Sequence, residues 1–267
     1  MSIEIENVRK DIRMRAESDP LMSKAWLLVY LIPILAIILG VLVAVFWVIA
    51  IATAPMLPVP SGPIGPELIV APFVIWIALL YLLVIVGFIV SIVLIYKLVK
   101  RRNTHFKRQQ FLFEDIVSAL RAIAKKKEVN VEVEVSSCER TVREVKAEET
   151  EKGAVLWAIL SAIIILAHWY VNYFLMKDFY KHERREDGFW EDVKSVLNKF
   201  GVTFSFPRRT VVMPDRSFVL YLILTIITLG LFGIYWLYVL LKDPNEHFNY
   251  HIQVEDELLS ALESVAI

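Results

Sequence analysis

The amino-acid sequence predicts a mainly α-helical integral membrane protein, built from a helical hairpin and two further apolar segments. Of its 267 residues, 57% are hydrophobic, a larger share than is usual for a soluble domain, and the mean hydropathy is +0.56. Residues 25–66 and 68–96 contain no charged side chain, and a helix needs only about 20 apolar residues to cross a bilayer. A polar pattern that recurs three times along the chain indicates an internal repeat.

Residues 25–96 are predicted to form a transmembrane hairpin of two helices, 25–54 and 68–96. The intervening residues 55–66 hold five prolines and two glycines, which is typical of a turn. Cations without any acid follow the second helix, which by the positive-inside rule places both ends of the hairpin in the cytoplasm. These cations are candidate ligands for anionic lipid headgroups: Lys97, Lys100, Arg101, Arg102, Lys107 and Arg108.

Two more apolar segments follow, at residues 153–176 and 218–241. If each crossed the bilayer once, residues 177–216 would lie outside with nine cations, against the positive-inside rule. Two glycines in the middle of the last segment favour a turn between two arms, each too short to cross a bilayer core of about 30 Å. We therefore favour re-entrant hairpins, with single spans as the alternative, in a multi-pass cell-membrane protein whose N- and C-termini are cytoplasmic.

The repeat consists of a histidine, an acidic pair nine and ten residues later, a serine and a leucine, with offsets of 77 and 142 from the first copy. We expect three repeats, at residues 1–126 (with the full hairpin), 127–200 and 201–267. Each ends in an amphipathic helix, because its apolar residues recur every three or four positions. The repeated polar positions are His105, Glu114, Asp115, His182, Glu191, Asp192, His247, Asp256 and Glu257.

Two short runs between the repeats predict β-strands. Residues 128–135 alternate strictly between valine and a polar residue, and residues 202–206 alternate at the same place in the next repeat. Alternation with a period of two is typical of a strand with one buried face. We expect these strands to pair on the cytoplasmic side.

A family resemblance rests on the last apolar segment and the helix after it. Residues 228–236 read Thr-Leu-Gly-Leu-Phe-Gly-Ile-Tyr-Trp, and residues 242–248 read Lys-Asp-Pro-Asn-Glu-His-Phe. This stretch resembles a family of uncharacterised prokaryotic, often archaeal, membrane proteins that carry a TLGxFxIYW segment followed by KDxNEHF. The resemblance implies a membrane protein of unknown function and supplies no catalytic residues.

The sequence offers few candidates for chemistry. His247, His251 and Glu255 lie four residues apart on one helix face and are weak candidates for metal ligands, but the other repeats do not preserve the set. We interpret them as a polar helix face and expect no bound metal. The repeated histidines are expected to brace the repeats against one another rather than to react. His168 is a polar residue within an apolar segment, which makes it a candidate functional position.

The expected function is that of a non-enzymatic membrane protein without a cofactor. Insertions followed by amphipathic helices are typical of proteins that scaffold an assembly or shape the cytoplasmic leaflet. The alternative is an oligomeric transporter or channel built from repeated membrane hairpins. The expected partners are the lipid bilayer, anionic headgroups, and further copies or other subunits of a membrane complex. Zero net charge gives no indication of a nucleic-acid partner.

Overall fold

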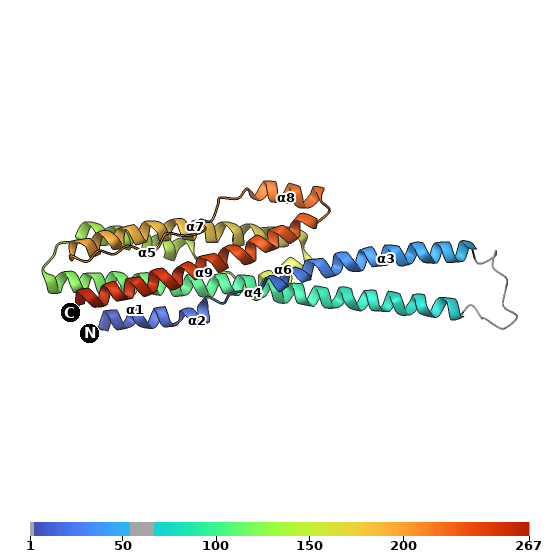
Figure 1. Cartoon of the computed structure of the whole chain (residues 1–267), viewed down its shortest axis with the longest axis horizontal. Coiled ribbons are helices and arrows are strands. Elements are labelled where there is room, and N and C mark those ends of the chain that lie inside the picture. The colour runs from blue at the N-terminus through green and yellow to red at the C-terminus, as the bar shows by residue number, and fades with distance from the viewer. Residues whose placement is uncertain (1–2, 54–66, 267) are drawn as a thin grey trace. The chain divides into compact units, whose positions relative to one another are not determined.

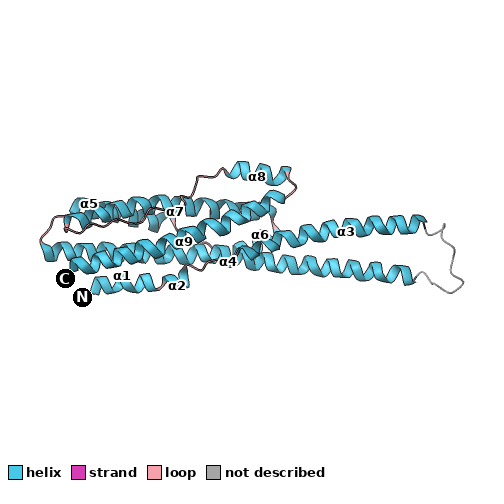
Figure 2. Ribbon diagram, in the orientation of Figure 1, coloured by secondary structure: helices cyan, strands magenta, loops and turns pink. Residues whose placement is uncertain are grey.

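The computed structural model describes residues 3–53 and 67–266, which are almost entirely helical (Figure 2). They form two compact units: a bundle unit, Met1–Lys24 with Ile95–Ile267, and a hairpin unit, Ala25–Leu94. The long helix α4, Glu67–Lys127, contributes to both. The hairpin unit also contains most of η1, Lys24–Leu27, and all of α3, Leu28–Thr53. The other helices belong to the bundle unit: α1 (Ile3–Arg13), α2 (Arg15–Ser18), α5 (Glu132–Glu148), α6 (Ala154–Ile163), α7 (Ile165–Lys199), α8 (Phe218–Ile227) and α9 (Leu231–Ala266).

Two stretches of helix are long and apolar enough to cross a membrane, Lys24–Ile49 and Val74–Lys127. They confirm the two helices predicted for residues 25–54 and 68–96 as far as the structure describes them; the predicted turn at 55–66 lies outside the described residues. Most of their apolar side chains are exposed. This exposure is consistent with a hydrocarbon surrounding, because lipid tails solvate such side chains at no cost.

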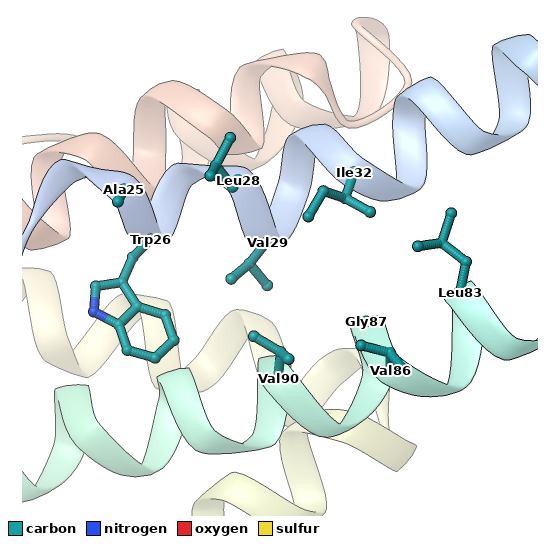
Figure 3. A pocket seen from close by; sticks show the side chains of 9 residues that line it. All are labelled: Ala25, Trp26, Leu28, Val29, Ile32, Leu83, Val86, Gly87 and Val90. Carbon is teal, nitrogen blue, oxygen red and sulfur yellow. The ribbon is translucent and has the colours of Figure 1, made fainter.

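The two helices of the hairpin unit leave an apolar groove between them (Figure 3). Ala25 and Gly87, whose side chains are small or absent, open a space of about 280 Å³ beside Trp26. A second apolar space adjoins it further along the same helices, around Gly40 and Phe88. No charged residue lines either space, so the groove offers only van der Waals contacts to whatever fills it.

The bundle unit is organised around α4, α7 and α9 (Figure 1). Each of them buries apolar residues at spacings of three and four, as the predicted amphipathic helices require. Phe113 of α4 stacks on Phe189 of α7 with ring centroids 4.0 Å apart. The ring of Trp190 packs edge-on against Phe113, with centroids 5.7 Å apart. Val254, Leu258, Leu262 and Val265 of α9 complete this core.

The predicted strand at residues 128–135 is wrong, because α5 begins within it at Glu132. The buried residues of this region are Val131, Val135, Cys138, Val142 and Val145, whose spacing of four and three is that of one helix face. The alternation of valines suggested that all of them share one buried strand face, but Val133 is 79% exposed. The predicted strand at 202–206 is also wrong: these residues form a loop in which Phe204 packs into the core. The described residues contain no β-strand.

Both of the later apolar segments are broken helices that fold back on themselves. Extended backbone at Ile164 separates α6 from α7, and Trp157 of α6 packs against Tyr170 of α7. In the last segment the turn lies at Leu229 and Gly230, where Gly230 has a φ of 93° that only glycine adopts without strain. The first arms, α6 and α8, have 10 residues each, which corresponds to about 15 Å of helix.

Candidate metal centre

Three long helices of the bundle unit bring four buried histidines into contact. His105 lies on α4, His182 on α7, and His247 and His251 one turn apart on α9. The Nε2 atom of His105 lies 3.3 Å from that of His182 and 3.2 Å from that of His247. The Nε2 atoms of His247 and His251 are 3.0 Å apart. The four side chains can therefore direct one nitrogen each at a common point.

The other nitrogen of each histidine lies next to a carboxylate. A neutral histidine that donates its Nδ1 hydrogen to a carboxylate keeps a lone pair on Nε2. Such lone pairs face one another here, and either a proton on one Nε2 or a metal ion between them makes the arrangement favourable. Carboxylates in the same role orient the histidine ligands of many metal sites. The pairs are His105 with Asp19 at 2.9 Å, His182 with Glu149 at 2.9 Å, His251 with Glu255 at 2.8 Å, and His247 with Glu183 at 3.4 Å. Nδ1 of His247 is equally close, at 3.4 Å, to Nη1 of Arg209, and Nδ1 of His251 also lies 2.6 Å from the side-chain nitrogen of Gln109.

A fifth carboxylate, that of Glu186, faces the histidines directly. It lies one turn after His182 on α7 and is fully buried. Its Oε1 is 3.0 Å from Nε2 of His251, and its Oε2 is 3.7 Å from Nε2 of His247. Burial favours the neutral acid, but His251 and Arg209 outweigh it and hold the pKa of Glu186 well below its usual range. Glu186 is therefore an ionised carboxylate next to His247 and His251.

Burial keeps two of the histidines neutral, whereas a third is cationic. Burial, only partly offset by Asp19, lowers the pKa of His105 to about 4, and burial with the neighbouring His251 keeps the pKa of His247 well below its usual range. Burial also opposes the charged form of His251, but Glu186 and other neighbouring carboxylates outweigh it and raise that pKa to about 9. Near neutral pH, His251 is the one histidine of these three that is protonated on both ring nitrogens and positively charged.

The buried charges around the histidines are nearly balanced. The carboxylates that touch the histidines, all at most 4% exposed, are Asp19, Glu149, Glu183, Glu186 and Glu255. Only two similarly buried guanidinium groups pair with them: Arg108, 2.7 Å from Asp19 and 2.8 Å from Glu255, and Arg209, 2.7 Å from Glu186. The more exposed Arg15 and Arg185 offset part of the remainder. Five carboxylates thus face four guanidinium groups, and the cationic His251 completes the balance, so a metal ion would take the place of that imidazolium proton rather than neutralise a surplus.

The residues predicted from the sequence take different places in this geometry. The repeated histidines His105, His182 and His247 meet one another, a contact that was not predicted from the sequence. Of the weak metal candidates, His247 and His251 point Nε2 into the cluster, whereas Glu255 binds Nδ1 of His251 from behind. His168 is half-buried near the start of α7, outside the cluster.

The repeated acidic pairs lie away from the histidines, on exposed or half-exposed faces. Glu114 pairs with Lys146 at 3.0 Å, and Asp256 pairs with Arg15 at 3.1 Å. The interactions that hold the repeats together are therefore not histidine-to-acidic-pair contacts. The remaining members of these pairs are Asp115, Glu191, Asp192 and Glu257.

Half of the predicted headgroup ligands are buried, which corrects that expectation for them. Arg101, Arg102 and Arg108 are at most 2% exposed, because α4 continues without a break into the bundle unit and is covered there. Arg101 binds Asn245 at 2.8 Å, and Arg102 binds Asp178 at 2.8 Å. Lys97, Lys100 and Lys107 are exposed.

Sequence reasoning missed four of the carboxylates, Asp19, Glu149, Glu183 and Glu186, and the buried amide of Gln109. Gln109, Glu186 and His251 all lie four residues after a repeated histidine, so they share its helix face, and all three are fully buried at the centre. Gln109 donates to Glu255 at 2.8 Å. These residues could have been found from their common position in the repeat, four residues after the histidine, although their residue types differ.

Comparison with known proteins adds a family match for one part of the chain. Residues 216–262 match a family described as a domain of unknown function, DUF4234. The match covers α8 and most of α9, including His247 and His251, and agrees with the resemblance to an uncharacterised family. The searches of curated proteins and of solved structures returned no match.

Proposed function

We propose that this protein is a membrane-anchored metalloprotein that holds one divalent transition-metal ion between His105, His182, His247 and His251. The observation that carries the proposal is the convergence of four Nε2 atoms whose companion Nδ1 atoms each lie next to a carboxylate. A bound ion would also give the facing Nε2 lone pairs of the neutral histidines a partner. The ion would cross-link three helices of the bundle unit.

The ligand set favours a first-row ion of borderline softness. Imidazole suits iron, cobalt, nickel, copper and zinc, whereas soft Cu(I) prefers sulfur and hard Ca²⁺ prefers oxygen. Zinc–nitrogen bonds of about 2.0–2.1 Å place tetrahedral ligands roughly 3.3–3.4 Å apart. Three of the six nitrogen pairs here are 3.0–3.3 Å apart, and all four nitrogens lie within 4.8 Å of one another. The single thiol, Cys138, is buried on α5, and burial raises its pKa to about 12, so it is no competing ligand.

The test is metal analysis of the purified full-length chain in detergent, after loading with Fe²⁺, Co²⁺, Ni²⁺ or Zn²⁺ and removal of loosely bound ion. We expect about one tightly bound ion per chain in the wild type. The His105→Ala variant and the double variant His247→Ala with His251→Ala should lose it. The matched control is His168→Ala, which removes a histidine outside the cluster and should keep the ion. A wild type that retains none of these ions would refute the proposal.

We also propose that the turns between α6 and α7 and between α8 and α9 dip into the membrane without crossing it. Their tips expose apolar side chains, with Ile163 at 72%, Ile227 at 71% and Leu229 at 93% exposure. Arms of about 15 Å do not cross a core of about 30 Å. Within the bundle unit, α6 and α8 lie toward the end opposite the first turn of α1 and the last turn of α9 (Figure 1), which would let both tips enter the same leaflet.

The corresponding topology has both termini and residues 177–216 in the cytoplasm of a multi-pass cell-membrane protein. The test uses Lys181→Cys, an exposed position, in a chain whose buried Cys138 is replaced by serine. We expect protection from an impermeant maleimide in intact cells and labelling after lysis. Ser61→Cys, in the predicted external turn, is the control that should label in intact cells. Labelling at position 181 in intact cells would contradict the proposal.

The three-repeat organisation, at 1–126, 127–200 and 201–267, is likewise a proposal, and two asparagines support it. Asn103 donates to the backbone oxygen of Lys152 at 2.6 Å and accepts from its amide at 3.2 Å. Asn245, 142 positions later, holds Met22 in the same way at 2.9 and 3.0 Å. Equivalent asparagines thus hold segments that lead into apolar helices.

The remaining expectations stay predictions. They are the scaffold or membrane-shaping function, the alternative of an oligomeric transporter or channel, the absence of enzymatic activity, assembly into oligomers, and headgroup binding by the exposed lysines. None of them conflicts with a bound ion at the histidine cluster.

A further inference from the structure

We infer that Glu186 is a fifth ligand of the metal ion and that Arg209 is the positioning residue that holds it in place. This inference rests on the proposed metal binding and specifies its coordination. It adds one hard oxygen ligand to four imidazoles and links the ion to the long segment between α7 and α8.

The first support is distance. Ligand atoms bound to one ion at about 2.0–2.2 Å lie roughly 3 Å apart when they are neighbours in the coordination sphere. The Glu186 Oε1 atom is 3.0 Å from Nε2 of His251, the same separation as between His251 and His247. Oε1 of Glu186 is thus as close to Nε2 of His251 as the proposed ligand atom Nε2 of His247 is. Glu255, by contrast, reaches only the Nδ1 side of His251.

The second support is the way in which the carboxylate is fixed from behind. Oε1 accepts a hydrogen bond from the indole Nε1 of Trp190 at 2.7 Å, and Oε2 accepts one from Arg209 at 2.7 Å. Each carboxylate oxygen has further acceptor capacity. Since both known donors approach from α7 and from the loop, the capacity that remains on Oε1 is available toward the histidines.

The third support is the set of contacts that Arg209 makes. It lies between α7 and α8, in a segment without helix or strand, and is only 6% exposed as a side chain. Its Nε binds Asp187 at 2.9 Å, and its Nη1 lies 3.4 Å from Glu183. The guanidinium also covers the ring of Tyr250 at 3.7 Å. The planar guanidinium group of arginine can bind several partners at once in a fixed geometry, and the single ammonium group of lysine cannot.

Two consequences distinguish this arrangement from a four-histidine site. The ion has five protein ligands, four nitrogens and one oxygen. Release of the ion also depends on the Arg209 segment, because Glu186 leaves the ion more readily once Arg209 no longer fixes its second oxygen. Outer partners of metal ligands typically change metal affinity 10- to 100-fold.

The experiment is X-ray absorption spectroscopy on the zinc-loaded full-length chain, combined with the rate of zinc transfer to a chelator. We expect five nitrogen or oxygen ligands in the wild type and four in Glu186→Gln and Glu186→Asp, the second of which retracts the carboxylate by one methylene. Arg209→Lys should keep five ligands but release zinc about tenfold faster or more. Arg208→Lys is the matched control: this neighbouring arginine is exposed, and the variant should retain five ligands and slow release.

The possible failures are distinguishable. A wild type with four ligands, together with an unchanged ligand number and release rate in both Glu186 variants, would overturn this inference and leave the four-histidine site intact. Glu186 would then bind only a protonated His251. A wild type that takes up no ion would overturn the proposed function as well.

Discussion

The Nε2 atom of His105 lies 3.2 Å from that of His247, although 142 positions separate the two residues in the chain. The contact joins α4 to α9, and His182 of α7 completes the group at 3.3 Å from His105. A centre assembled from three distant helices exists only in the folded state. Binding of an ion there is therefore linked to the stability of the whole bundle unit.

Removal of the metal should lower the thermal stability of the protein. An ion at about 100 times its Kd stabilises the folded state by about 2.7 kcal/mol, which corresponds to roughly 5–10 °C in Tm for a chain of this size. We expect a chelator to lower Tm by this amount and added metal to restore it. His168→Ala should respond as the wild type does, and His182→Ala should not respond. An unchanged wild-type Tm would contradict the prediction.

Glu149→Gln should weaken metal binding without removing a ligand. Glu149 holds Nδ1 of His182 at 2.9 Å and also binds Arg185. Loss of the charge frees the ring orientation of His182, so we expect a 10- to 100-fold higher Kd, measured by competition with a chelating dye. The adjacent Glu148 also binds Arg185 but is 56% exposed, and Glu148→Gln should leave the Kd unchanged. Equal effects of the two variants would argue against a role of Glu149 at the centre.

Arg108 and Lys107 should differ sharply although they are neighbours. Arg108 is 1% exposed and bridges Asp19 and Glu255, so Arg108→Gln leaves two buried carboxylates without their partner. Loss of one member of a buried ion pair costs about 3–5 kcal/mol. Lys107 is exposed, and Lys107→Gln should change stability by less than about 0.5 kcal/mol. Denaturant unfolding in detergent measures both, and similar stabilities would show that Arg108 is not buried.

Asp11 should make stability depend on pH. Burial, together with Asp115, raises the pKa of Asp11 from 3.8 to about 6. A raised carboxyl pKa contributes stability that is complete below pH 4 and is lost as the pH rises through 6. At pH 7.5, Asp11→Asn should therefore raise the stability by about 1 kcal/mol, or about 2–4 °C in Tm. The difference should vanish below pH 4, and an exposed change such as Glu257→Gln should show no such trend. A lower Tm of Asp11→Asn at pH 7.5 would contradict the prediction.

Much of the helical arrangement could be predicted from composition and spacing. The uncharged stretches predicted the apolar helices, and the glycine pair predicted the turn, which the structure places at Gly230. The strand at 128–135 failed because eight residues can satisfy a period of two by chance, while burial from Val131 to Val145 follows a helix. Short alternating runs carry too little information to exclude a helix whose buried face extends beyond them.

The candidate site was only partly predictable. The repeat indicated that His105, His182 and His247 hold equivalent places, and His251, four residues after the last of them, was a weak metal candidate. The repeat did not show that the three helices turn the same face toward one point, since that depends on how the helices pack. Asp19 and Glu149 lie outside the repeated pattern, in segments between helices, and no spacing connects them to the histidines they bind.

His247 and His251 lie on α9, which follows α4 and α7 in the chain, so the ribosome synthesises them after His105 and His182. Translation at about 5–20 residues per second separates the appearance of His105 from that of His247 by roughly 7–28 s. The hairpin unit and α7 are synthesised in this interval or before it, while the centre still lacks half of its nitrogens. A polypeptide that stops before α9 therefore lacks two of the four proposed ligands and could not form the proposed centre.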